Sequence, residues 1–166
     1  MENFRLDTEK IKRLFEEHDV RISIWPLKKC FETDNLPQPL QEYLKLINLP
    51  ISLHITHHGS ALTYLMTQKE IEELYKDELC IPCIEHGYLI IGSGLNGDLL
   101  CVNIESGKVG YAFHDDLWDN CYDDFDDIYI ELPCYLDEFL DMAFNNEDYP
   151  FDGYKAEDFV KSKGQQ

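Results

Sequence analysis

Short apolar runs separated by glycine-containing turns predict a block of β-strands in the middle of the chain. Residues 88–113 hold three such runs, YLII, LLCVNI and VGYAF, separated by the loop GSGLNGD and the turn ESGK. Runs of this length are typical of strands, and glycine in the connections permits tight reversals. We therefore expect an antiparallel three-stranded meander here. A hairpin is also predicted for residues 51–56 and 61–66, with Gly59 at its turn.

Two shorter stretches are further strand candidates. Val20, Ile22 and Ile24 alternate with polar residues until Pro26, and residues 128–130 form the brief apolar run IYI. Alternation of this kind is typical of a strand with one buried face, and proline ends it because it cannot donate to a ladder. Residues 78–84 are expected to lead into the first strand of the meander.

Helical spacing of apolar residues appears on both sides of this block. It predicts a helix over residues 8–18, a second between Pro39 and Pro50, and a helical turn or two at residues 156–163. The stretch TQKE from Thr67 has the spacing of a capping box and predicts a short helix. Pro133 is expected to open another helix.

Together these elements predict an α+β fold in a single domain spanning residues 1–166. Helices from both ends of the chain are expected to pack on one face of a mostly antiparallel sheet of about five or six strands. A chain of 166 residues can bury an adequate core without disulfides or a structural metal. The six cysteines are scattered and are expected to remain thiols.

The net charge of the chain limits the kinds of molecule that it is expected to bind. The chain has 14 basic and 33 acidic residues, a formal net charge of −19. Such a surface repels nucleic acid and anionic membranes and favours basic protein partners. No apolar run approaches the roughly 18 residues of a membrane span, and the first residues lack a secretory core. We therefore expect a cytoplasmic protein that binds neither nucleic acid nor membranes.

The loop between the first two runs of the meander carries Gly92, Gly94 and Gly97 in the spacing Gly-x-Gly-x-x-Gly. In dinucleotide-binding proteins this spacing precedes a helix whose N-terminus faces a pyrophosphate. Here a strand-like run follows Asp98 at once, so no helix is expected there. We interpret the three glycines as structural, with no cofactor bound.

Cys80 and Cys83 have the spacing of a redox dithiol or of half a zinc site, and they are the strongest indication of a different chemistry. A redox pair belongs at a strand-to-helix junction, whereas the residues after Cys83 are expected to lead back into a strand. His86 lies three residues after Cys83, and the further zinc ligands would have to come from residues without paired spacing, which are His54, His57, His58 and Cys101. Buried thiols and solvated histidines are the simpler interpretation. No metal site and no catalytic group are expected.

The acidic excess is concentrated near the end of the chain. From residue 111 onward there are 16 Asp or Glu and three Lys, and seven of the acids are Asp residues between positions 115 and 127. A long solvated loop or sheet edge is one interpretation. A protein interface is the other, because large aromatic residues stand among the charges. The candidate interface consists of Asp115, Asp116, Trp118, Asp119, Tyr122, Asp123, Asp124, Asp126 and Asp127.

Four stretches resemble the SUKH superfamily, the Smi/Knr-type and Syd-like domains. Residues 91–102 (IGSGLNGDLLCV) look like its glycine-rich loop ending in Gly-Asp before a strand, and residues 109–116 (VGYAFHDD) like the later strand ending in an aromatic, His and acidic cluster. Residues 36–44 (LPQPLQEYL) and 134–140 (CYLDEFL) look like its early Leu-Pro helix and its late helix. Residues 47–50 (INLP) stand where the family usually carries paired glycines.

The resemblance implies a non-enzymatic binding protein. In bacteria such domains are most often immunity proteins that neutralise a cognate secreted toxin, frequently a nuclease. The acidic charge is compatible with this, because a nuclease site that binds polyanions is basic. Two alternatives stay open, an intracellular regulatory scaffold of the Smi type and a small zinc or redox protein built on Cys80 and Cys83.

Overall fold

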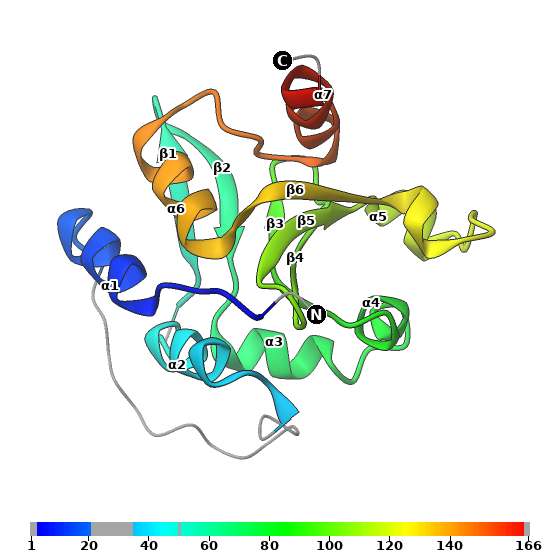
Figure 1. Cartoon of the computed structure of the whole chain (residues 1–166), viewed down its shortest axis with the longest axis horizontal. Coiled ribbons are helices and arrows are strands. Elements are labelled where there is room, and N and C mark those ends of the chain that lie inside the picture. Colours follow the sequence, from blue (N-terminus) through cyan, green and yellow to red (C-terminus); the bar gives the residue numbers. More distant parts are fainter. Residues whose placement is uncertain (1–2, 21–34, 50, 165–166) are drawn as a thin grey trace.

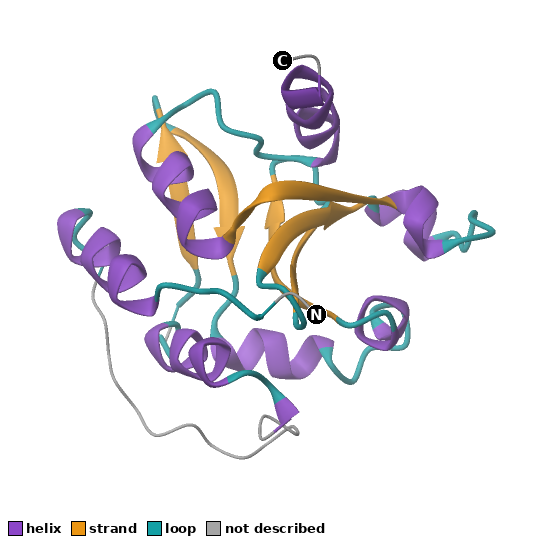
Figure 2. Ribbon diagram, in the orientation of Figure 1, coloured by secondary structure: helices purple, strands orange, loops and turns teal. Residues whose placement is uncertain are grey.

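A six-stranded antiparallel sheet forms the centre of the molecule (Figures 1 and 2). The computed structural model describes residues 3–20, 35–49 and 51–164. The strands follow one another in space in chain order, so the sheet is a continuous meander. Its strands are β1 (Leu53–His57), β2 (Ser60–Leu65), β3 (Tyr88–Gly94), β4 (Leu99–Asn103), β5 (Lys108–Ala112) and β6 (Tyr129–Tyr135). The predicted α+β class and antiparallel sheet are confirmed.

Helices of very different length surround the sheet. The described helices are α1 (Thr8–Glu17), α2 (Gln38–Leu46), α3 (Gln68–Leu74), α4 (Ile81–Glu85), α5 (His114–Trp118), α6 (Leu136–Asn145) and α7 (Gly153–Gly164), with a 3₁₀ turn η2 (Phe125–Ile128). The capping box predicted at Thr67 is present: the Glu70 backbone N donates to Thr67 Oγ1 at 3.3 Å, and the Thr67 backbone N donates to Glu70 Oε2 at 2.7 Å. The strand expected around Ile22 and Ile24 lies outside the described residues.

The pleat of the central strands divides their side chains between two cores. In β4, Leu100 and Val102 point into one core, and Leu99 and Cys101 into the other. The sheet is therefore buried on both faces, which explains why its strands contain continuous apolar runs.

The first core lies under the helices from the two ends of the chain. Ile11 and Phe15 of α1, Leu40 of α2, Phe139 of α6 and Ala156 of α7 are all buried in it. In Figure 1, α1 lies next to α2 and α6. This arrangement confirms that the N- and C-terminal helices pack on one face of the sheet.

The second core lies on the opposite face and was not predicted. It consists of apolar residues from α4, α5 and η2 packed on the sheet, namely Cys80, Cys83, Ile90, Leu99, Cys101, Ala112, Leu117, Phe125, Ile128 and Tyr129. Two expectations about these segments were wrong. Residues 81–85 form α4, with Pro82 in its first turn, rather than an approach to a strand. Residues 115–127, expected as a loop or edge, contain most of α5 and most of η2.

Pro133 does not open a helix, contrary to the sequence-based expectation. It lies within β6, and α6 begins three residues later, at Leu136. Strand β6 is at the edge of the sheet, and its pairing with β5 is irregular between Lys108 and Gly110. Proline is tolerated at edges and bulges because no ladder donor is lost there. The N-terminus of α6 is stabilised instead by Glu138, whose Oε2 accepts from the Tyr135 backbone N at 2.9 Å.

The three glycines of the central loop are needed for two different reasons. Gly97 has φ of +95°, a conformation that favours glycine. Gly92 and Gly94 have ordinary φ values, but a Cβ at either position would collide with backbone, the Tyr64 carbonyl oxygen at Gly92 and the Phe151 carbonyl oxygen at Gly94. Close approach of neighbouring backbone therefore requires glycine at these two positions.

We expect Gly92→Ala to lower the free energy of unfolding by about 1–3 kcal/mol, because a methyl group would press on the backbone of β2. The matched control is Gly164→Ala, where a Cβ would meet nothing within 4 Å. Urea unfolding of both variants tests this. Equal midpoints for Gly92→Ala and the unmodified protein would contradict the close-approach explanation.

Candidate functional site

Residues 114–127, hereafter the acidic segment, lie between β5 and β6 and extend from the right side of the molecule in Figure 1. Three apolar residues attach the segment and the end of η2 to the second core: Leu117, Phe125 and Ile128 are each no more than 3% exposed. Between these anchors Asn120 has φ of +54° and reverses the chain after α5. The seven Asp residues of the segment are consequently all exposed, and they are Asp115, Asp116, Asp119, Asp123, Asp124, Asp126 and Asp127.

The aromatic residues of the segment have different surroundings. Phe125 is buried in the second core, and Tyr122 is half-buried with its ring 6.5 Å from that of Phe125. Trp118 is 47% exposed, and its ring meets that of His114 edge-on at 5.1 Å. Of the aromatic residues in the predicted interface, Trp118 thus presents the largest free face, Tyr122 presents a smaller one, and the nearby Phe125 is structural.

Six of the seven Asp residues in the acidic segment have no ion-pair partner within the described part of the chain, and Asp115 has only His114. None of its seven carboxylates forms a salt bridge with a described Lys or Arg. Asp115 Oδ1 faces His114 Nε2 at 3.1 Å. Asp124 and Asp127 bond locally: the Asp126 backbone N donates to Asp124 Oδ1 at 3.3 Å and the Asp124 backbone N to Asp127 Oδ2 at 3.4 Å. These bonds shape η2 and leave the negative charge in place.

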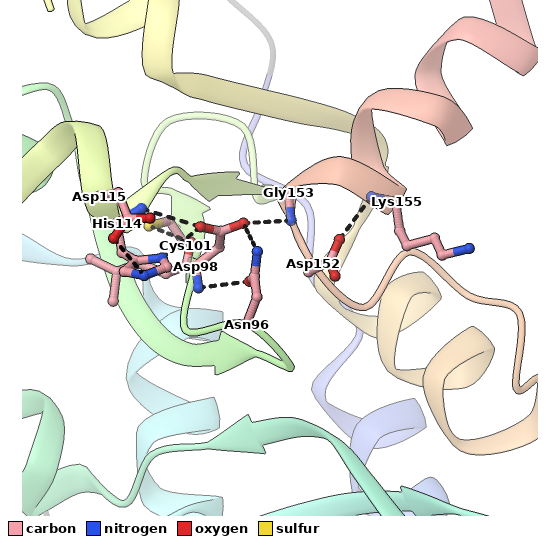
Figure 3. Close-up of polar contacts among 9 residues, drawn as sticks. Asn96, Asp98, Cys101, His114, Asp115, Asp152, Gly153 and Lys155 are labelled. Carbon is pink, nitrogen blue, oxygen red and sulfur yellow. Dashed lines mark hydrogen bonds and ion pairs between the residues drawn. The ribbon is translucent and has the colours of Figure 1, made fainter. Parts of the chain in front are cut away.

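A buried carboxylate fixes the start of the segment. Asp98, at the end of the glycine-rich loop, is 2% exposed. Its Oδ1 accepts from the backbone N of His114 at 3.2 Å and from the Nδ1 of the same residue at 2.8 Å, and its Oδ2 accepts from Asn96 Nδ2 at 2.8 Å and from the Gly153 backbone N at 3.0 Å (Figure 3). One carboxylate therefore joins the loop, the first residue of α5 and the first residue of α7.

Asp98 and His114 were not predicted as partners. Both lie in the stretches that resemble SUKH domains, Asp98 in the Gly-Asp pair and His114 in the aromatic, His and acidic cluster. Their juxtaposition gives these two motifs a structural role. A buried Asp needs compensating donors, and the adjacent β4 and β5 bring His114 to it. The sequence did offer one indication of this pairing: Asp98 directly precedes one predicted strand, and His114 directly follows the next.

The thiols around Cys80 form a cluster under α4. Cys80 precedes the helix and Cys83 lies in its first turn, so the pair does stand at a helix N-terminus, contrary to expectation. Both residues are buried, and the thiol of Cys101 contacts that of Cys83. Burial, followed by the nearby charge of Asp77, raises the pKa of the Cys80 thiol to about 11. Burial also holds the pKa of Cys101 well above its usual range.

This environment favours neutral, unreactive thiols over a redox pair, because the thiolate is the reactive form. All five described cysteines are free. Among the described residues, no three His, Cys, Asp or Glu side chains are placed to hold one metal ion. The zinc and redox alternatives thus gain no support from the geometry.

The histidines of the first hairpin have separate structural roles. His57 Nε2 donates to the Ala143 carbonyl oxygen at 2.6 Å and ties the hairpin to α6. His58 is exposed, has φ of +50° and pairs with Glu147. His54 packs edge-on against Tyr64. The expectation that these are simply solvated residues was therefore wrong for His57.

Comparison with known proteins finds no matching family model, no similar curated protein and no similar solved structure. The resemblance to SUKH domains accordingly depends on four short motifs alone, which lie in residues 36–44, 91–102, 109–116 and 134–140. In the described ranges, no helix combines the length and apolar character that crossing a membrane requires.

We expect Asp98→Ala to lower the free energy of unfolding by about 3 kcal/mol or more, because it leaves buried backbone N–H groups of His114 and Gly153 without an acceptor. Asp98→Asn, which keeps one acceptor oxygen, should have a smaller effect. Asp116→Ala, at an exposed position, is the control and should leave the thermal melt nearly unchanged. A melt of Asp98→Ala equal to that of the control would show that the buried carboxylate is dispensable.

The thiol cluster should resist alkylation in the folded protein. In a Cys30→Ser background at pH 8, iodoacetamide should modify the exposed Cys121 at least about tenfold faster than Cys80, since a raised pKa leaves little thiolate at Cys80. Tandem mass spectrometry of the tryptic peptides, which identifies the modified cysteine within each peptide, gives both rates. Modification of Cys80 as fast as that of Cys121 would restore the redox alternative.

Proposed function

We propose that the chain is a non-enzymatic protein-binding domain whose acidic segment binds a basic surface of a partner protein. The observation that carries the proposal is the set of seven exposed aspartates, none of which pairs with a described Lys or Arg, on a segment anchored in a core. Unneutralised like charges repel one another and destabilise the folded state. A basic partner would relieve this repulsion on binding.

The partner we propose is the toxin domain of a secreted bacterial toxin, with the chain as its cytoplasmic immunity protein. Two independent features support this class. The motifs around Asp98 and His114 resemble SUKH domains, in which immunity proteins are common. The net charge of −19 would attract a nuclease domain and compete with its polyanionic substrate.

Different residues of the segment would act on different steps of binding. Exposed charges such as Asp119, Asp123 and Asp124 accelerate encounter, because they act at a distance and are screened over about 10 Å at 0.1 M salt. Trp118 acts after encounter, because a half-exposed indole beside the charges offers apolar area for burial. Tyr122 adds a smaller contact at the margin of the second core.

The test asks first whether a neighbouring gene encodes a toxin with a basic domain, and then measures binding of that domain by stopped flow and its inhibition in parallel. Substitution of Asp119, Asp123 and Asp124 by Asn should slow association roughly tenfold at low salt and reduce its salt dependence. The control is Glu16→Gln with Glu17→Gln and Asp158→Asn, which removes the same charge from exposed positions elsewhere. The control should slow association much less.

Trp118→Ala should instead accelerate dissociation. Loss of a buried aromatic anchor costs about 2 kcal/mol, which is roughly a thirtyfold change in affinity. Unchanged association for the triple Asp variant, with an unchanged melt, would reject the acidic segment as the binding surface. Tight binding to a basic protein that is not a toxin would favour the regulatory scaffold instead.

A further inference from the structure

A concave surface lies away from the acidic segment. A pocket of about 390 Å³ opens between β2 and α3, a volume within the usual range of ligand sites. Its apolar lining is formed by Tyr64, Met66 and Leu74. Met66 and Leu74 also pack against the second core, so the floor of the pocket is continuous with the interior of the protein.

The other lining residues are all acidic. Glu70, Glu73 and Asp77 follow one face of α3 and the turn after it, at positions i, i+3 and i+7. None of the three forms a salt bridge with a Lys or Arg in the described ranges. The pocket thus combines an apolar floor with a negative wall that the described residues leave unneutralised.

Glu70 is held in place before any ligand arrives. Its Oε2 accepts from the Thr67 backbone N at 2.7 Å, and its Oε1 accepts from the Tyr64 hydroxyl. Burial and this bond raise the pKa of Tyr64, so the phenol stays a donor to the carboxylate at neutral pH. A fixed carboxylate loses less side-chain entropy on binding than a mobile one.

The three carboxylates do not converge on one point. Within the described part of the chain, no group of three acidic, His or Cys side chains is placed to hold a metal ion. The negative wall therefore suits an extended cation with an apolar stem. A guanidinium has five donors in a planar fork, is weakly hydrated and stacks on aromatic rings, whereas an ammonium is a compact, strongly hydrated point charge.

We propose that the pocket between β2 and α3 binds an arginine side chain of a partner protein, with the guanidinium against Glu73 and Asp77 and the methylene stem on Met66 and Leu74. This proposal rests on the proposed function in one respect, since both require a basic protein partner. It does not depend on the acidic segment, because the pocket can be tested with a small probe.

The probe is N-acetyl-L-arginine N-methylamide, and the neutral control is the citrulline analogue, which has nearly the same shape without the charge. In an NMR titration we expect saturable shifts at the Met66 methyl group and at the amides of residues 70–77, with a dissociation constant of roughly 1–10 mM. The citrulline analogue should bind at least about tenfold more weakly. Equal binding of the two compounds would overturn the proposal.

Variants locate the site. Glu73→Gln with Asp77→Asn should weaken binding of the arginine probe at least about fivefold, whereas Glu72→Gln with Glu78→Gln, which removes the same charge from residues outside the lining, should change it little. Substitution of Asp119, Asp123 and Asp124 by Asn should also leave binding of the arginine probe unchanged. A negative result for the pocket is therefore distinguishable from a negative result for the acidic segment. Equal loss in both α3 variants, or shifts centred on the acidic segment, would overturn the assignment. A further probe, N-acetyl-L-lysine N-methylamide, should bind more weakly than the arginine compound, and equal binding of the two would also overturn it.

Discussion

The carboxylate of Asp98 is the interaction on which the arrangement of the candidate site depends. A buried charge is unfavourable unless donors surround it, and Asp98 accepts from four, two of them backbone N–H groups. These donors come from three separate segments, which the carboxylate fixes relative to one another. Gly153 contributes by its lack of a side chain, because a Cβ there would lie 2.6 Å from Asp98 Oδ2. The first residue of the acidic segment, His114, is therefore fixed relative to the sheet.

The two faces of the sheet have different roles in the structure. The first face is covered by α1, α2, α6 and α7 and supplies most of the large buried side chains. Among the described residues, the elements that pack on the second face are short, and the acidic segment is held there by Leu117, Phe125 and Ile128. Full burial of such a side chain contributes about 1.5–3 kcal/mol, which offsets repulsion between exposed aspartates. Because different helices cover the two faces, a charged surface can be presented without disturbing the first core.

The sequence allowed prediction of the features that are local and periodic. The meander, the hairpin at Gly59, the capping box at Thr67 and the helices at both ends follow from the spacing of a few neighbouring residues. The helices α4 and α5 are only five residues long, too short for a helical period to be recognised. Pro133 was misassigned because a proline before a helix and a proline in an edge strand have the same local sequence.

Exposure within the candidate site could be inferred only in part. A run of aspartates predicts solvent contact, and the segment is exposed as its charge requires. The separate roles of Trp118 and Phe125 depend on which side of a short helix or turn meets the sheet, and this is a tertiary property. The bond from Gly153 to Asp98 joins residues 55 positions apart, and no local pattern indicates it.

We propose above that a basic partner protein binds over the acidic segment, on the second face of the sheet. Hydrogen exchange measured with and without the cognate toxin domain tests it most directly, because it maps the contact without altering any residue. We expect slowed exchange in residues 114–127, with the amides of α1 and α6 unchanged. Protection centred on α1 and α6, with free exchange in the acidic segment, would contradict it.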